Sequence, residues 1–142
     1  MTGKSPPHFK YVIVCDDIRE EKSNKTLIVG MYASKIIVPR VPAVLPKLCF
    51  RLCFDTTRSN LNTFNLLIRK PSGIKVGPFA VNPPSHVDVP EGYINISIIP
   101  FPIEEIGAYD VIAETGGKEE KIYRFFVETT GSPSAEPAPQ KH

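Results

Sequence analysis

The stretch YINISIIPFPIEEIGAYDVIAETGGKEEKIYRFFVE, residues Tyr93–Glu128, decides the fold of this chain. Apolar and polar side chains alternate from Ile94 to Ile98, which is typical of a strand with one buried face. Gly116 and Gly117 form a two-residue hairpin signal, and apolar residues recur at every second position after it. This part of the chain therefore predicts three successive strands.

The second of these strands begins with Gly107-Ala-Tyr109-Asp-Val111. A Gly-x-Tyr-x-Val start to the next-to-last strand is typical of the tyrosine corner of immunoglobulin-like sandwiches, where the phenol reaches back to the backbone at the crossing between the sheets. We expect this structural role for Tyr109. The chain has no tryptophan, and Val111 stands where antibody domains have their second disulfide cysteine, so C2-like or jelly-roll connectivity remains open.

The rest of the chain also reads as strands, with turn signals about every ten residues. Leu48–Asp55 alternates most sharply and predicts a half-buried strand. Asp16-Asp17 is expected to end the first strand, the proline-rich residues 39–46 to form an edge or a connection, and Pro102–Ile106 to be a turn. The other expected strands are Phe9–Cys15, Thr26–Tyr32, Ile36–Val38, Phe64–Ile68 and a weak edge strand at Lys75–Val81. The predicted fold class is all-β, a two-layer antiparallel sandwich of eight or nine strands with an immunoglobulin-like layout.

The length of 142 residues suits one domain. We place the β-sandwich at residues 8–130, about 120 residues, which is enough to bury one core. Residues 1–7 and 131–142 are rich in proline, serine, alanine and charge. Because they offer little apolar area to offset the entropy of ordering, both segments are expected to be disordered tails.

Composition argues against several classes of function. The net charge is +2 and the charges are mixed along the chain, so no nucleic-acid partner is expected. No signal peptide is visible and the apolar runs are strand-sized, so neither secretion nor a membrane span is expected. Three cysteines without CxxC or HxxxH spacing indicate free thiols in a reducing cytoplasm rather than a zinc site, and no cofactor is expected.

Four short motifs occur in succession in the first third of the chain: CDDIR at Cys15–Arg19, KTLIVGMY at Lys25–Tyr32, IVPRVP at Ile37–Pro42 and LPKL at Leu45–Leu48. This succession resembles the opening of a family of small bacterial proteins catalogued as a domain of unknown function. Asn24 stands where a turn glycine often precedes the lysine, and it keeps the turn chemistry. The resemblance implies a cytosolic bacterial or phage β-domain, and it implies no activity.

The densest charged cluster begins at Asp16-Asp17, where a strand is expected to meet a loop. With Asp55 and Asp88 from other loops, these carboxylates are weak candidates for a Ca²⁺ site, because hard cations need several oxygen ligands. No D-x-D-x-D spacing supports the ion, and capping of a turn with solvated ion pairs is the favoured interpretation. Arg19 is expected to be a structural bridge that pins the first hairpin, so Arg19→Ala should lower the melting temperature.

Catalysis is not expected. His86 has Ser85 and Asp88 beside it, but neighbours on an extended loop point apart, whereas the members of a hydrolase triad must converge. The chain has no G-x-S-x-G elbow. Gly116-Gly117 lies in a hairpin rather than before a helix, so it is no phosphate-binding loop.

A partner surface is expected on the face opposite the inward residues of the last strands, at Ile99, Ile112, Ile122 and Phe126. If solvent covered these side chains, the apolar patch would be large enough to indicate a function. Coverage by the proline-rich segment or the tails is the alternative. We therefore expect a non-catalytic interaction or structural module that binds a protein partner, most simply a second copy of the chain in a homodimer. A ligand- or Ca²⁺-binding sandwich is the alternative function.

Overall fold

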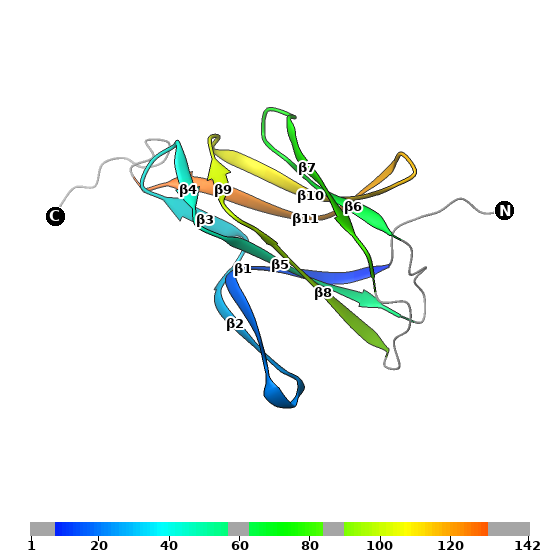
Figure 1. Cartoon of the computed structure of the whole chain (residues 1–142). Coiled ribbons are helices and arrows are strands. Elements are labelled where there is room, and N and C mark those ends of the chain that lie inside the picture. The colour runs from blue at the N-terminus through cyan, green and yellow to red at the C-terminus, as the bar shows by residue number, and fades with distance from the viewer. Residues whose placement is uncertain (1–7, 57–62, 84–89, 131–142) are drawn as a thin grey trace.

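The computed structural model describes residues 8–56, 63–83 and 90–130, and Figure 1 shows their arrangement. The described residues form eleven strands and one 3-10 turn, with no α-helix among them, so the prediction of an all-β chain is confirmed. The elements are β1 (Phe9–Glu21), η1 (Lys22–Asn24), β2 (Lys25–Tyr32), β3 (Lys35–Val38), β4 (Ala43–Leu45), β5 (Leu48–Asp55), β6 (Phe64–Arg69), β7 (Lys75–Val81), β8 (Glu91–Ile98), β9 (Phe101–Ile103), β10 (Gly107–Thr115) and β11 (Lys118–Thr129).

Two main sheets and one small ribbon contain these strands. A four-stranded sheet has the order β2-β1-β5-β8, and a five-stranded sheet has the order β3-β11-β10-β6-β7. Neighbouring strands run antiparallel, apart from β3, which is parallel to β11. Among the strands of the described residues, β4 and β9 pair only with each other. Consecutive strands often belong to different sheets, as in β5 and β6 or β7 and β8, so the chain crosses repeatedly between the two layers.

The core lies between the two main sheets and is made by alternate residues of their central strands. Every second residue of a strand faces the same side, and the alternation in the sequence matches this geometry. Burial of each large apolar side chain stabilises the fold by roughly 1.5–3 kcal/mol. The most buried members include Val14, Leu48, Phe50, Leu52, Phe64, Leu66, Ile68, Tyr109, Val111, Phe125 and Val127.

Tyr109 joins this core to the backbone before β10. Its hydroxyl donates a hydrogen bond to the carbonyl oxygen of Glu105 at 2.7 Å. Its ring is 1% exposed and stacks on Phe125 with 5.1 Å between the ring centroids. Gly107 enters the strand with φ +131, and a Cβ there would lie 3.1 Å from Pro71 Cγ, so the backbone at this corner favours glycine.

The first strand is longer than the sequence indicated. Phe9–Cys15 was expected to end at Asp16-Asp17, but β1 continues to Glu21 and pairs with β2 through the polar residues. Beyond Cys15 the strand pairs with β2 and no longer with β5. Residues 16–21 lie in a two-stranded ribbon outside the core and bury little on either face. They need no apolar alternation, which is why this part of β1 read as a loop.

Two further strands lie inside proline-rich segments. Residues 39–46 were expected to be an edge or a connection, and Pro102–Ile106 a turn. Ala43–Leu45 pairs with Phe101–Ile103, and Pro102 is opposite Val44. Proline is tolerated there because each of these three-residue strands has an unpaired side. The Pro102–Ile106 segment thus begins as a strand rather than as a turn.

β5 differs from its prediction in burial. Its alternation predicted one exposed face, yet every residue from Leu48 to Phe54 is buried. The side chains of Cys49, Arg51 and Cys53 lie on the face away from the core, as the alternation requires, and are nevertheless covered. The residues that cover this outer face belong to the candidate site described next.

Candidate functional site

A hairpin arm, defined as residues 16–32, extends from the four-stranded sheet. It consists of the last part of β1, the 3-10 turn and β2, and Figure 1 shows it projecting from the rest of the strands. Its turn contains Ser23 with φ 68, a left-handed conformation that is uncommon for residues other than glycine. β2 is the edge strand of its sheet, so one side of its backbone is unpaired within the described residues.

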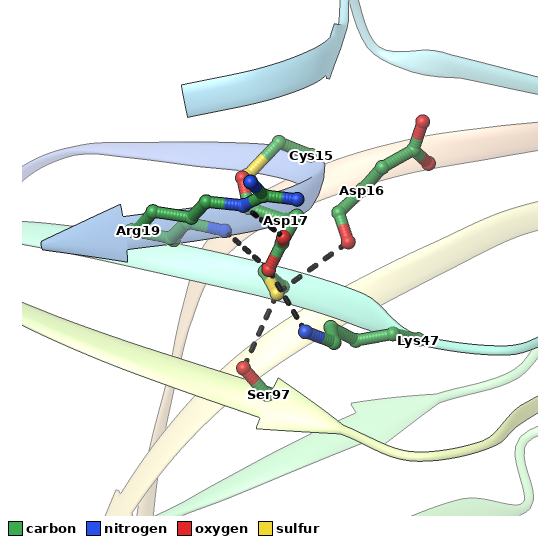
Figure 2. Close-up of polar contacts among 8 residues, drawn as sticks. Cys15, Asp16, Asp17, Arg19, Lys47 and Ser97 are labelled. Atoms are coloured by element: carbon green, nitrogen blue, oxygen red, sulfur yellow. Dashed lines mark hydrogen bonds and ion pairs between the residues drawn. The ribbon is translucent and has the colours of Figure 1, made fainter. Parts of the chain in front are cut away.

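An ion pair at the root of the arm holds it to β5. Lys47, the residue before β5, lies 2.8 Å from Asp17 Oδ1, and Arg19 Nε donates to Asp17 Oδ2 at 3.0 Å. Figure 2 shows these two cations converging on the one carboxylate. Hydrogen bonds from Lys47, and then from Arg19, lower the pKa of Asp17 to about 2. The same contact raises the pKa of Lys47.

A second contact lies further along the arm, at Glu20. Asn95 of β8 donates from Nδ2 to Glu20 Oε2 at 2.7 Å, and Arg51 Nη1 lies 4.0 Å from the same oxygen. Arg51 also donates to Asn95 Oδ1 at 3.0 Å, and its guanidinium lies 4.0 Å from the centre of the Tyr93 ring. Arg51 pairs in register with Ile13, seven residues before Glu20. The arm must therefore bend back over the outer face of the sheet to bring Glu20 there.

Asp16 faces the other way. Figure 2 shows its carboxylate turned away from the Lys47–Asp17 contact, and Tyr32 donates its hydroxyl hydrogen to Asp16 Oδ1 at 2.5 Å. Burial and then this hydrogen bond raise the pKa of Tyr32. A Cβ at Gly30, which has φ +67, would lie 2.2 Å from Asp16 Oδ2. Glycine at this position therefore lets the Asp16 carboxylate lie close to the backbone of β2.

Cys15 and Cys49 lie under the root of the arm and are directly opposite each other on β1 and β5. Both are fully buried free thiols. Burial is the first cause that raises the pKa of the Cys15 thiol to about 11. Cys53, also buried and free, is opposite Tyr11 and not opposite another cysteine.

A row of exposed aliphatic side chains follows the edge strand β2. Leu27, Val29 and Met31 are 42%, 38% and 64% exposed, and they alternate along the strand, so they share one face. Their register partners on β1 are Arg19, Asp17 and Cys15. The outer face of the sheet therefore presents an apolar row beside a charged one. We call Leu27, Val29 and Met31 the β2 row.

The four residues expected to form a partner surface do not share one exposed face. Ile99 and Phe126 are 66% and 40% exposed, but Ile112 is 1% exposed and Ile122 is half-buried against the core. Ile112 lies inside the five-stranded sheet between Leu67 and Lys121. A bulge leaves Ile122 as an extra residue on β11, so the simple alternation behind the expectation fails at this point.

The expected acidic residues are not brought together. Asp17 is engaged by two cations and Asp16 by Tyr32 on the opposite side. Asp55 ends β5, about 23 Å from Leu48 at 3.3 Å per residue, so it lies far from the arm root. Asp88 falls outside the described residues, as do Ser85 and His86. Within residues 8–56, 63–83 and 90–130, no three His, Cys, Asp or Glu side chains are placed to share a metal ion.

Arg19 differs from its expected role. Its partner Asp17 is two residues away on the same strand, so the contact does not join the two strands of the hairpin. Of the two ion pairs of Asp17, the one with Lys47 joins the arm to the start of β5. No motif in the sequence pointed to the other residues of this site, beyond the alternation of β5, because their contacts depend on the bend of the arm. These residues are Lys47, Glu20, Arg51 and Asn95.

The comparisons with known proteins place the chain in a family without assigning an activity. Residues 10–128 match the family described as "Family of unknown function (DUF6941)", and the chain belongs to this family. The prediction of a family of unknown function is thus confirmed, while the bacterial or phage origin stays a prediction. A comparison with curated proteins gave no match. No helix in the described part of the chain is long and apolar enough to cross a membrane.

Proposed function

We propose that this protein is a non-catalytic protein-interaction module built on an immunoglobulin-like sandwich, and that the β2 row is its binding surface. The strand orders support the layout: if β1, β5 and β8 are strands A, B and E, then β7, β6, β10 and β11 follow as C′, C, F and G. The contact from Tyr109 to the backbone before β10 lies where a tyrosine corner belongs.

The single observation that carries the proposal is the exposure of the β2 row on an open edge. Proteins commonly protect edge strands by shortness, proline or charge. β7 has Pro78, β3 has four residues, and β8 exposes the polar side chains of Asn95 and Ser97. β2 has eight residues without proline, and Met31 in its row is 64% exposed. A partner strand that pairs with β2 would cover the row and satisfy the open backbone groups.

We assign a second copy of the chain as the partner, because the edge is complementary to itself. Antiparallel pairing of two β2 strands about a two-fold axis at Ile28 places Leu27 opposite Val29 of the second copy. On β1, Arg19 is the neighbour of Leu27 and Asp17 is the neighbour of Val29. Each Leu27–Val29 pair across the dimer therefore has the positive charge of Arg19 on one side and the negative charge of Asp17 from the second copy on the other. The pairing joins two four-stranded sheets into one.

The test is the mass in solution by size-exclusion chromatography with light scattering, at tens of micromolar. Met31→Lys and Ile99→Lys form a matched pair, since the two side chains are 64% and 66% exposed and only Met31 belongs to the β2 row. We expect a dimer for the wild type and for Ile99→Lys, and a monomer for Met31→Lys. A monomeric wild type, or the loss of the dimer in both variants alike, would refute the proposal.

A further inference from the structure

The two thiols beneath the arm root have the spacing of a disulfide. Cys15 and Cys49 are direct register partners, so their side chains point to the same face of the sheet. Directly opposed residues on antiparallel strands have Cα atoms about 4.5 or 5.5 Å apart, and disulfides join Cα atoms about 4.4–6.8 Å apart. Both types of pair fall within this range. The bond therefore needs rotation of the two side chains and no shift in register.

The pair also lies at the point where the arm leaves the sandwich. Cys15 is the last β1 residue that pairs with β5. Cys15 Sγ donates to the carbonyl oxygen of Asp17 at 3.5 Å, and Cys49 Sγ to that of Asp16 at 3.7 Å, so each thiol contacts the backbone of the arm root. Cys49 Sγ also lies 3.2 Å from Ser97 Oγ. A covalent bond would replace weak contacts across the bend.

We propose that Cys15 and Cys49 form a redox-active pair that closes to a disulfide between β1 and β5 when a low-molecular-weight disulfide such as glutathione disulfide oxidises it. One protein thiolate attacks a sulfur of the oxidant, the oxidant's S–S bond breaks, and one thiol leaves. The second protein thiolate then attacks the protein sulfur of the mixed disulfide and releases the second thiol. The two protein thiols lose two electrons and two protons, and the oxidant gains both as two thiols.

Access to the pair depends on the arm. Both thiols are fully buried, and the pKa of Cys15 is raised to about 11 by burial, so the closed form reacts slowly. The Lys47–Asp17 ion pair holds the same bend closed, and its removal should make oxidation faster. An effect of the disulfide on dimer formation rests on the proposed function, because β2 belongs to the arm. The formation of the disulfide itself does not rest on the proposed function.

The experiment treats the full chain with glutathione disulfide and removes the oxidant. Separate samples are then used to measure intact mass without blocking, to count free thiols in denaturant, and to map linked peptides after the remaining thiols are blocked. We expect the mass to fall by about 2 Da without a glutathione adduct, since two hydrogens are lost. Free thiols counted in denaturant should fall from three to one, with a peptide joining Cys15 to Cys49. Cys53→Ser should still form the bond, whereas Cys49→Ser should not. Lys47→Met should oxidise faster than the wild type, with Arg19→Met as the control.

Three results would overturn the inference. They are three free thiols after prolonged oxidation, a stable glutathione adduct in place of an internal bond, or a bond that involves Cys53. Equal oxidation rates for Lys47→Met and the wild type would remove the role of the arm. If Cys49→Ser fails to fold, the linked peptide of the wild type decides alone. Light scattering keeps the two proposals apart, because a monomeric wild type that forms the bond refutes the dimer only.

Discussion

Replacement of Tyr109 by phenylalanine removes the hydroxyl that joins β10 to the backbone carbonyl of Glu105. The hydroxyl is buried and donates to Glu105 at 2.7 Å. The ring stacks on Phe125, and phenylalanine can keep this stacking. The variant therefore takes this donor away from the carbonyl of Glu105, a partly buried residue, which costs about 1–3 kcal/mol. For a domain of this size we expect the melting temperature to fall by roughly 3–15 °C, at about 3–5 °C per kcal/mol.

Tyr123→Phe is the matched control for this change. Tyr123 is half-buried on the neighbouring strand β11, opposite Val111, and its hydroxyl makes no hydrogen bond to the described residues. We expect its loss to change the free energy of unfolding by less than about 0.5 kcal/mol. Urea unfolding of both variants and the wild type gives the comparison, with equal m-values showing that the denatured states are alike. If Tyr109→Phe is as stable as Tyr123→Phe, the corner does not support the fold as argued.

Three further predictions concern the hairpin arm. Lys47→Met should lower the melting temperature more than Arg19→Met, because Lys47 binds Asp17 from outside the arm, whereas Arg19 binds it from within the same strand. Equal shifts in a thermal scan would contradict this. The pKa of Asp17 is lowered to about 2 in the fold, so its contribution to stability is present above about pH 4 and is lost as the pH falls towards 2. In acid titration, Asp17→Asn should flatten this part of the curve of unfolding free energy against pH. An unchanged curve would count against the ion pair. Gly30→Ala should destabilise the chain by roughly 1–3 kcal/mol, because its φ is +67 and its Cβ would collide with Asp16; wild-type stability in urea would show that the arm adjusts freely.

The proposed dimer and the proposed disulfide use different parts of the arm. The dimer depends on the exposed β2 row, and the disulfide depends on two buried thiols at the arm root. If both hold, the redox state of Cys15 and Cys49 changes how firmly the binding strand is attached to the sandwich. Light scattering of the oxidised and reduced protein would measure that effect directly.

Much of the fold could be predicted because its signals are local. Alternation within strands such as Leu48–Asp55, and the two glycines after β10, depend on residues near each other in the chain. The start of β10 also placed Tyr109 at a corner, since a glycine with positive φ and a tyrosine two residues later form one short motif. Short proline-rich strands such as β4 and β9 were missed because each forms only against the other.

Local patterns in the sequence were enough to predict an all-β chain and the inward faces of strands such as β5 and β6. They were also enough to place Tyr109 near the start of β10. Only the tertiary structure shows that β1 continues past Asp16-Asp17 into the hairpin arm, and that the bend of this arm brings Glu20 close to Arg51. It also decided that Cys15 lies opposite Cys49, and that a bulge turns Ile122 inward. The physical reason is range: side-chain alternation is set between neighbouring residues, whereas register, bulges and the path of a ribbon outside the core are set by contacts between residues far apart in the chain.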